Sequence, residues 1–304
     1  MRTIFFMLRV PNLLIIALTF LLLRYFVFIP VYSAYSIIPA MVSLHYLLMI
    51  TSTILIAIAG YISNDYFDVV TDRVNKPDKQ YIGTQISAGT ALSTSVLFSF
   101  LALVPGIWLT LLMKSWLPAT LLLLALTVAW WYAIKLKKSL LWGNIAVAGM
   151  SAGTIAMAWL IENQFSHVPN EPFRIISGII IAVSIFAFLL SLVREIVKDI
   201  EDMEGDLLIK CRSLPIVKGI PFTKTILLVF TVITIFFLIM AQIYLVQFFR
   251  IFAAVWLLIC VEIPLIYFMK SLADAKAKTD YHKLSTMLKW IMMGGMGSII
   301  AGQF

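Results

Sequence analysis

The chain has 304 residues, of which 62% are hydrophobic and only 12% are charged. Because a soluble domain is about half apolar and about a quarter charged, this composition excludes a soluble globular protein, a disordered chain and a disulfide scaffold. The net charge of +8 does not indicate a nucleic-acid partner, since Lys and Arg in a membrane protein mark the cytoplasmic loops. The composition predicts a protein that crosses a cell membrane several times.

Long apolar runs alternate with short polar segments along the whole chain. A helix needs about 20 apolar residues to cross a bilayer, so these runs predict an all-α, polytopic bundle of nine transmembrane helices. We expect one membrane-embedded domain over residues 1–304. The predicted spans cover residues 10–30, 41–63, 91–111, 117–134, 143–161, 175–193, 222–245, 251–269 and 285–303.

The basic residues predict the orientation of the bundle. With the N-terminus placed in the cytoplasm, 19 of the 23 Lys and Arg residues fall in cytoplasmic segments and only three fall in external ones. Cytoplasmic loops carry the excess of Lys and Arg, so the distribution predicts a cytoplasmic N-terminus.

Ten of the 15 acidic residues lie in two short segments at the cytoplasmic ends of the second and sixth spans. The first acidic segment lies within residues 64–90. Asn64, Asp68 and Asp72 are spaced i, i+4, i+8 there, so they share one face of a helix. No breaker separates this segment from the second span, and the helix is predicted to continue until Pro77 stops it.

The second acidic segment lies within residues 194–220 and follows the sixth span in the same way. Asp199, Asp202 and Asp206 again share a helix face, and Gly205 is the expected C-terminal end of that helix. The separation from Asp68 to Asp202 equals the separation from Asp72 to Asp206, which hints at two related halves.

Carboxylates on one helix face repel one another, so each segment needs a counter-charge. Mg²⁺ binds one or two carboxylates and completes its shell with water and substrate phosphate oxygens. Two such faces at a membrane surface therefore predict a diphosphate held through Mg²⁺. The alternative is that the acids are solvated helix ends paired with nearby Lys and Arg, but two matched segments favour the metal site over that interpretation.

The two segments resemble the signatures of the UbiA-type intramembrane prenyltransferase superfamily. The first is similar to its Asn-x₃-Asp-x₃-Asp signature and continues through residues 72–77 as Asp-Arg-Val-Asn-Lys-Pro. The second matches its Lys-Asp-x₂-Asp-x-Glu-Gly-Asp signature over residues 198–206. The chain departs from the family pattern at Lys79, where an arginine is usual, and at Gln80, where a proline is usual.

The resemblance implies that Mg²⁺ held by both motifs binds an isoprenyl diphosphate, expected to be geranylgeranyl diphosphate, whose allylic carbon is then attacked by a hydrophobic acceptor. It implies metal-site roles for Asn64, Asp68, Asp72, Asp199, Asp202 and Asp206. It implies catalytic roles for Asp68, Asp199 and Tyr132. It implies diphosphate contacts from Arg9, Arg73, Lys76, Lys137, Lys138, Lys198 and Arg212.

The acceptor is the least determined part of the prediction. Residues 194–206 resemble most the members that act on geranylgeranylglyceryl phosphate in ether-lipid synthesis. An aromatic acceptor of quinone biosynthesis is the alternative. An ion-coupled transporter is a further alternative, but a transporter is expected to place its acids near the bilayer midplane rather than at the ends of the spans.

Overall fold

The computed structural model describes residues 8–75, 77, 80–166, 168–247 and 250–303. Within these ranges the regular structure is helical, and nine helical segments are long and apolar enough to cross a membrane, which confirms the predicted all-α polytopic bundle. The segments are Val10–Ala34, Ser43–Phe67, Ala88–Met113, Leu117–Ile134, Trp142–Ser166, Asn170–Glu201, Ile220–Gln247, Ile251–Asp274 and Lys278–Ala301. The side on which the N-terminus lies stays a prediction.

Two of the spans contain a π-helical turn. The first consists of α2 (Val10–Leu23), the π turn Arg24–Phe28 and α3 (Ile29–Ala34), and the eighth consists of α13 (Ile251–Leu257), the π turn Leu258–Glu262 and α14 (Ile263–Asp274). In both spans a proline, Pro30 or Pro264, is the second residue after the π turn. Proline cannot donate to the carbonyl four residues before it, and a wider turn accommodates the loss without ending the span.

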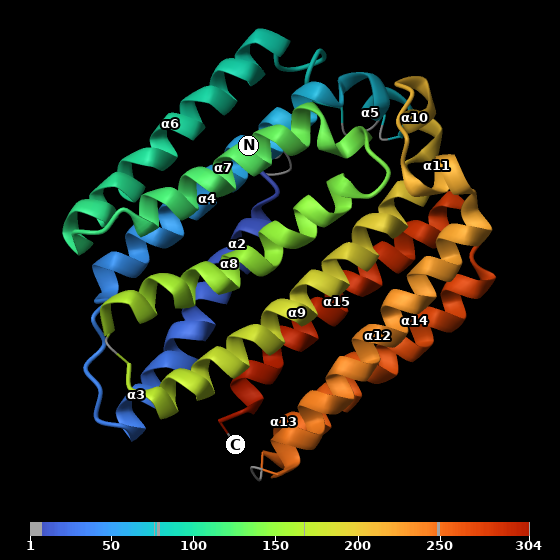
Figure 1. The fold of residues 1–304 in the computed structure, drawn as a ribbon. Coiled ribbons are helices and arrows are strands. Elements are labelled where there is room, and N and C mark those ends of the chain that lie inside the picture. Colours follow the sequence, from blue (N-terminus) through green and yellow to red (C-terminus); the bar gives the residue numbers. More distant parts are fainter. Residues whose placement is uncertain (1–7, 76, 78–79, 167, 248–249, 304) are drawn as a thin grey trace.

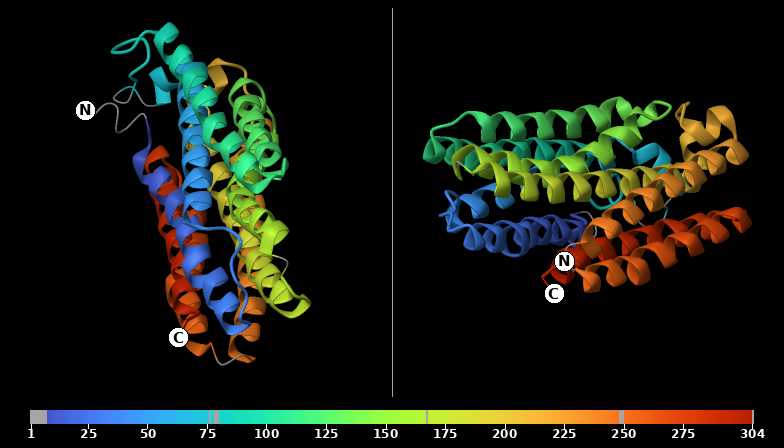
Figure 2. Two further views of the ribbon diagram at one scale, coloured as in Figure 1. Left: turned by 90° about the vertical axis from the view of Figure 1, so that its left-hand side faces the viewer. Right: turned by 60° about the horizontal axis from the view of Figure 1, so that its bottom comes forward.

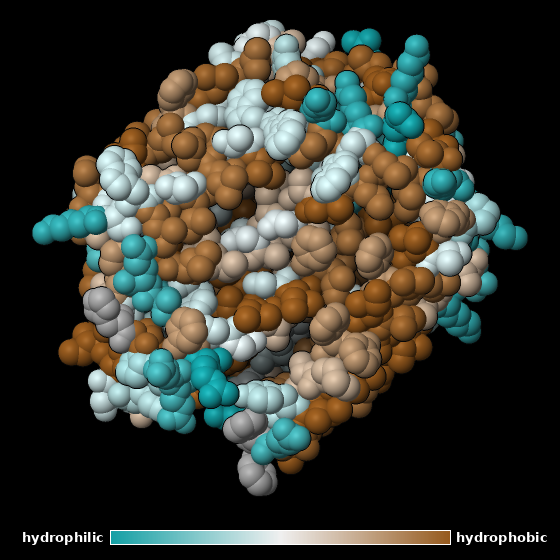
Figure 3. Space-filling view, in the orientation of Figure 1, coloured by the Kyte–Doolittle hydropathy of each residue, from teal (hydrophilic) through white to brown (hydrophobic). Residues whose placement is uncertain are grey.

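The spans pack as one bundle with apolar contacts on the inside and an apolar outer surface. α4 (Ser43–Phe67) packs against α6 (Ala88–Met113) and α7 (Leu117–Ile134), and α8 (Trp142–Ser166) packs against α9 (Asn170–Glu201). α9 also contacts α12 (Ile220–Gln247) and α15 (Lys278–Ala301), as Figures 1 and 2 show. Figure 3 shows hydrophobic residues over most of one face, as lipid contact requires.

The short helices gather at one end of the bundle. α5 (Val69–Asn75), α10 (Met203–Leu208) and α11 (Leu214–Lys218) lie together there in Figure 1, although α5 follows the second span and the other two follow the sixth. α5 and α10 are in direct contact. This end therefore carries both acidic segments.

Candidate functional site

The first acidic segment turns at its central aspartate. α4 ends at Phe67, Asp68 is its C-cap with φ −96° and ψ 4°, and α5 begins at Val69. The Thr71 hydroxyl donates to the Asp68 carbonyl oxygen at 2.9 Å and stabilises the turn. The prediction of one helix that continues to Pro77 was therefore wrong, and Asp72 lies on a second, short helix.

The second acidic segment makes the same turn. α9 ends at Glu201, Asp202 is its C-cap with φ −95° and ψ 4°, and α10 begins at Met203. Asp68 and Asp202 thus occupy equivalent places, in agreement with the equal separation of the motif aspartates along the chain. Gly205 lies inside α10, so the prediction that it ends a helix was wrong.

Asn75 joins the two acidic segments. Its Nδ2 donates to the Asp202 carbonyl oxygen at 2.8 Å, and its Oδ1 accepts from the Gly205 amide at 3.0 Å. α10 approaches so closely that a Cβ added at Gly205 would lie 2.8 Å from the carbonyl oxygen of Thr71. The absence of a side chain at Gly205 is what allows the two segments to pack side by side.

Asp68 is held between an amide and a cation. Asn64 Nδ2 donates to Asp68 Oδ2 at 2.8 Å, and Lys137 Nζ lies 2.6 Å from Asp68 Oδ1. The Lys137 side chain is only 8% exposed. It comes from the 3₁₀ turn Leu136–Lys138, which folds against Gly143 at the start of α8, where an added Cβ would lie 2.8 Å from the Leu136 carbonyl oxygen. The turn between α7 and α8 thus places the buried Lys137 ammonium next to the first acidic segment.

Asp199 lies one turn beyond a second charged cluster on α9. Asn144 Nδ2 of α8 donates to Asp199 Oδ2 at 2.8 Å. The buried Glu195 carboxylate accepts from Arg194 Nη1 at 2.7 Å and from Lys198 Nζ at 3.4 Å. Positively and negatively charged side chains therefore alternate along α9 next to Asp199.

Tyr132 of α7 lies where the two motifs converge. Its phenol interacts electrostatically with Asp68 of the first motif and with Asp199 and Glu195 of α9. Tyr132 is half-buried at the last turn of α7, directly before the turn that carries Lys137. The structure therefore brings the one aromatic candidate into the same region as the aspartates.

Cys211 also lies close to both acidic segments. Its amide donates to the Asp206 carbonyl oxygen at 3.0 Å, and its side chain is buried. Burial, together with the nearby Asp206 and Asp68 carboxylates, raises the pKa of the Cys211 thiol to about 12. The thiol therefore stays protonated at neutral pH, and carboxylates of both acidic segments are close enough to affect it.

The predicted diphosphate contacts divide into two groups. Lys137 and Lys198 face the site, whereas the side chains of Arg73, Lys138 and Arg212 are exposed. The Arg212 amide donates to the Lys138 carbonyl oxygen at 3.0 Å, so these two residues join the basic turn to the second segment through backbone alone. Lys76 lies outside the described residues.

Arg9 pairs with an aspartate at the end of α4, and its expected contact with diphosphate stays a prediction. Its Nη2 lies 2.6 Å from Asp65 Oδ1, and its guanidinium stacks over the Tyr61 ring at 4.8 Å from the centroid. Asp65 is next to Asn64 but belongs to neither aspartate face. Arg9 therefore anchors the start of α2 to the end of α4.

The oxygen groups at this end fit a hard divalent cation. Asn64 Oδ1 is buried and has no hydrogen-bond donor, while its Nδ2 holds Asp68. Within the described ranges, no three carboxylate, thiol or imidazole groups are close enough to hold an ion by themselves. Mg²⁺ needs only one or two carboxylates when substrate oxygens complete its shell, so the donor set fits a metal that is bound together with a phosphorylated substrate.

Several contact residues were not predicted as part of the site. Asn75 joins the segments, Asn144 orients Asp199, and Glu195 balances Arg194 and Lys198. Asn75 lies in the stretch of residues 72–77 that resembles the family signature, and Glu195 lies in the second acidic segment, but neither pattern predicted these contacts. His282 Nδ1 of α15 also lies 2.7 Å from Glu201 Oε1, although the histidines show no metal-binding spacing.

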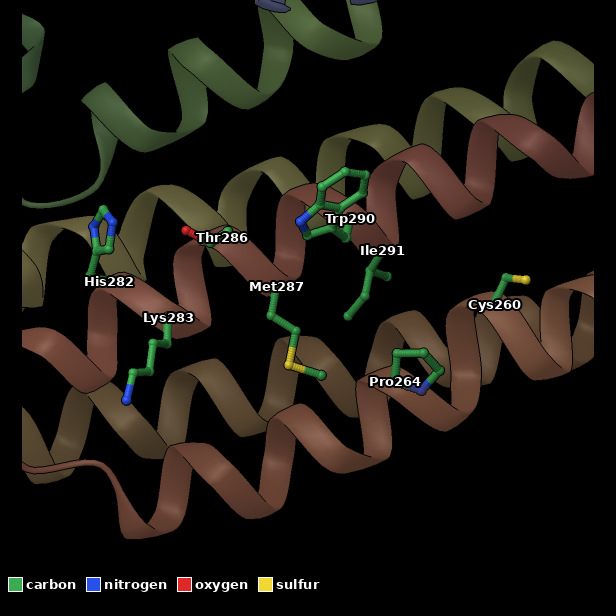
Figure 4. Close-up of a pocket in the computed structure, with 8 residues that line it drawn as sticks. All are labelled: Cys260, Pro264, His282, Lys283, Thr286, Met287, Trp290 and Ile291. Atoms are coloured by element: carbon green, nitrogen blue, oxygen red, sulfur yellow. The ribbon is translucent and has the colours of Figure 1, made fainter.

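A groove of about 590 Å³ lies between α14 and α15 rather than between the acidic segments. Figure 4 shows Lys283 and Met287 of α15 and Pro264 of α14 lining it. It contains neither aspartate motif, and we assign it no part in the site.

The fold and this site together define a class of protein. An all-helical membrane bundle joins two matched aspartate segments at one end, and a buried lysine and a tyrosine lie beside them. This arrangement is typical of an integral-membrane transferase that acts on a phosphorylated lipid substrate through a divalent metal. The chain belongs to the UbiA prenyltransferase family, whose model matches residues 27–292. It is accordingly a multi-pass membrane protein.

Curated relatives of the chain are archaeal. It is 34% identical over 161 residues to the digeranylgeranylglyceryl phosphate synthase of Methanobrevibacter smithii, covering 53% of this chain and 54% of that one. It is 28% identical over 246 residues to the enzyme of the same name from Methanosphaera stadtmanae, covering 80% and 82%. The first of these alignments spans only about half the length of the relative.

Solved structures share the fold over nearly the whole chain. A structure described as that of a digeranylgeranylglyceryl phosphate synthase in membranes has a TM-score of 0.61 and 24% identity, covering 99% of this chain and 97% of that one. A UbiA homologue from Archaeoglobus fulgidus bound to GPP and Mg²⁺ has a TM-score of 0.59 and 13% identity, covering 98% and 99%. At these identities the likeness concerns the fold.

Proposed function

We propose that this chain transfers a geranylgeranyl group from geranylgeranyl diphosphate to the free hydroxyl of geranylgeranylglyceryl phosphate, with Mg²⁺ as cofactor. The observation that carries this proposal is the contact between the two acidic segments through Asn75 and Gly205. The name shared by the archaeal relatives supports the choice of acceptor.

The metal-site residues in the proposal are Asn64, Asp68, Asp72, Asp199, Asp202 and Asp206. Mg²⁺, when bound there, would neutralise the diphosphate oxygens and stabilise the charge of the leaving group. Asn64 holds Asp68 in place, and Asn144 holds Asp199. These amides fix the carboxylates before substrate binds, which lowers the cost of assembling the site.

The reaction exchanges one carbon–oxygen bond for another. The bond from C1 of the prenyl group to the diphosphate oxygen breaks, a bond from C1 to the acceptor hydroxyl oxygen forms, and the hydroxyl proton is released. The Lys137 ammonium, which lies 2.6 Å from Asp68, would stabilise the negative charge of the departing diphosphate. The face of the Tyr132 ring stabilises positive charge that develops on the allylic carbons.

A product assay tests the proposed function. Purified protein in lipid is supplied with labelled geranylgeranyl diphosphate, Mg²⁺ and either geranylgeranylglyceryl phosphate, an aromatic quinone precursor or no acceptor. We expect a Mg²⁺-dependent ether product with the glyceryl phosphate lipid only. Product with the aromatic acceptor alone would overturn the choice of acceptor, and an absence of transfer to either would overturn the activity.

Replacement of Lys137 tests its part in diphosphate binding. Hydrogen bonds to charged groups contribute about 1.5–3 kcal/mol, so Lys137→Met is expected to lower kcat/KM for the prenyl diphosphate by about 10- to 100-fold. Lys135→Met is the matched control, because Lys135 is exposed two residues before Lys137 and is not among the expected diphosphate contacts, and we expect a change of less than about threefold. Equal losses in both variants would contradict the role of Lys137.

A further inference from the structure

Lys289 is a cation inside a membrane-spanning helix that the site described above does not use. It lies eleven residues into α15, about 16 Å along the helix axis from its first residue. Its Nζ donates to Asn12 Oδ1 of α2 at 3.0 Å. Among the described residues, no carboxylate lies within ion-pair distance of Lys289. An ionisable group within a span is costly and by default marks a functional site.

Arg194 of α9 lies next to Lys289. The two side chains are close enough for their positive charges to repel each other. Nη1 of Arg194 is paired with Glu195, but its Nε is buried and has no acceptor. Glu195 neutralises Arg194, but Lys289 has no carboxylate partner among the described residues and Arg194 Nε remains free to donate, so this pair of cations favours a further anionic group.

The surrounding groups leave this region with surplus positive charge. Arg9 and Lys198 also interact electrostatically with Glu195, and the Tyr61 phenol is hydrogen-bonded to Asn12 and interacts with Arg9 and Arg194. Arg9 is paired with Asp65, and Glu195 is shared by Arg194 and Lys198. Asp199 also interacts with Lys198, so four cations face three carboxylates, and the excess positive charge favours an anionic group such as a phosphomonoester.

The cluster of Arg194 and Lys289 lies close to the proposed metal site. Arg194 lies five residues before Asp199 on α9, so the two side chains are offset by about 7.5 Å along the helix axis. Tyr132 interacts electrostatically with both Glu195 and Asp199, so the two charge clusters open onto the same region. In a glyceryl phosphate lipid, the free hydroxyl and the phosphate are carried by the same glycerol unit, so a single molecule brings both groups to this region.

We propose that Lys289 and Arg194, with Asn12, bind the phosphate of a lipid phosphomonoester and thereby orient the hydroxyl of that lipid toward the aspartate site. The inference rests on the proposed function, because the lipid is the acceptor of that reaction. The proposed phosphate-binding site lies where α2, α9 and α15 meet. The protein recognises the phosphate group of the lipid there.

Assays with two alternative acceptors test the inference. The readout is the preference for the phosphorylated acceptor, which a lysine with a purely structural role would not change. Wild-type protein, Lys289→Met and Lys289→Arg are assayed with geranylgeranylglyceryl phosphate and with geranylgeranylglycerol, which lacks the phosphate. We expect Lys289→Met to raise KM for the phosphate lipid at least about tenfold while KM for geranylgeranyl diphosphate stays within about twofold. The preference for the phosphorylated acceptor should fall in parallel, and Lys289→Arg should restore most of it.

Lys283→Met is the matched control, since Lys283 lies on the same helix and lines the groove between α14 and α15 (Figure 4). We expect wild-type acceptor preference in that variant. An unchanged acceptor KM in Lys289→Met, with an active wild-type enzyme, would overturn the phosphate site alone. A wild-type enzyme that does not use the phosphate lipid would instead overturn the proposed function.

Discussion

Asp68→Asn and Asp199→Asn are each expected to lower turnover by at least about 10³-fold. Both variants keep the shape of the side chain but remove the negative charge that the metal requires. A metal ion contributes several kcal/mol of charge stabilisation in the transition state, and each 1.36 kcal/mol is a factor of ten in rate. Steady-state transfer from geranylgeranyl diphosphate, measured at saturating Mg²⁺, checks the expectation.

The fold of these two variants is checked by their thermal unfolding. In Asp199→Asn the new amide can still accept from Asn144, so we expect an unfolding temperature close to that of the wild type. Asp68→Asn also loses the ion pair with the buried Lys137, so we expect a lower unfolding temperature but still one cooperative transition. Asp274→Asn is the control for charge removal alone, because Asp274 is exposed at the end of α14, and it should retain full turnover. More than about a tenth of wild-type turnover in either Asp68→Asn or Asp199→Asn would remove that aspartate from the metal site.

Gly205→Val is expected to separate the two acidic segments and to abolish transfer. The first added carbon would already collide with Asn75 Nδ2 and would lie 2.8 Å from the Thr71 carbonyl oxygen, so α10 must move away from α5. Overpacking of this kind costs about 1–3 kcal/mol and breaks the two hydrogen bonds of Asn75. Turnover and thermal unfolding, measured on the same preparation, check the result.

Gly178→Ala is the matched control for the loss of a helical glycine. A Cβ added at Gly178 in α9 meets nothing within 4 Å, and alanine is the better helix former by about 1 kcal/mol. We expect unchanged turnover and equal or higher stability. If Gly205→Val retained both its turnover and its stability, the close contact between α5 and α10 would not be needed for the site.

The spans were predictable because lipid imposes a length and a composition on each one. All nine apolar runs became helices near their predicted bounds, and the largest differences lie where charged turns extend a helix beyond its apolar part, as in α9 and α15. The paired acidic segments were predictable as motifs, and the equal separation of their aspartates anticipated the matched turns at Asp68 and Asp202.

The turns themselves were not predictable from helical periodicity. Neither Asp68 nor Asp202 is preceded by a glycine or proline, and Asp68 is stabilised by the Thr71 hydroxyl, which periodicity does not show. The partners of the basic residues were not predictable either. Arg73 follows Asp72 directly in the sequence but is exposed, whereas Lys137 lies 69 residues from Asp68 and is the cation that pairs with it, because Gly143 lets its turn fold against α8.

Binding of a non-hydrolysable geranylgeranyl diphosphate analogue, with and without Mg²⁺, tests most directly whether both acidic segments hold one diphosphate. Titrations of the wild type, Asp68→Asn and Asp199→Asn in the same lipid give three pairs of affinities. We predict that Mg²⁺ tightens binding to the wild type and that either substitution alone abolishes this gain. A variant that keeps the full Mg²⁺-dependent gain would contradict a shared site and would leave the diphosphate to a single segment.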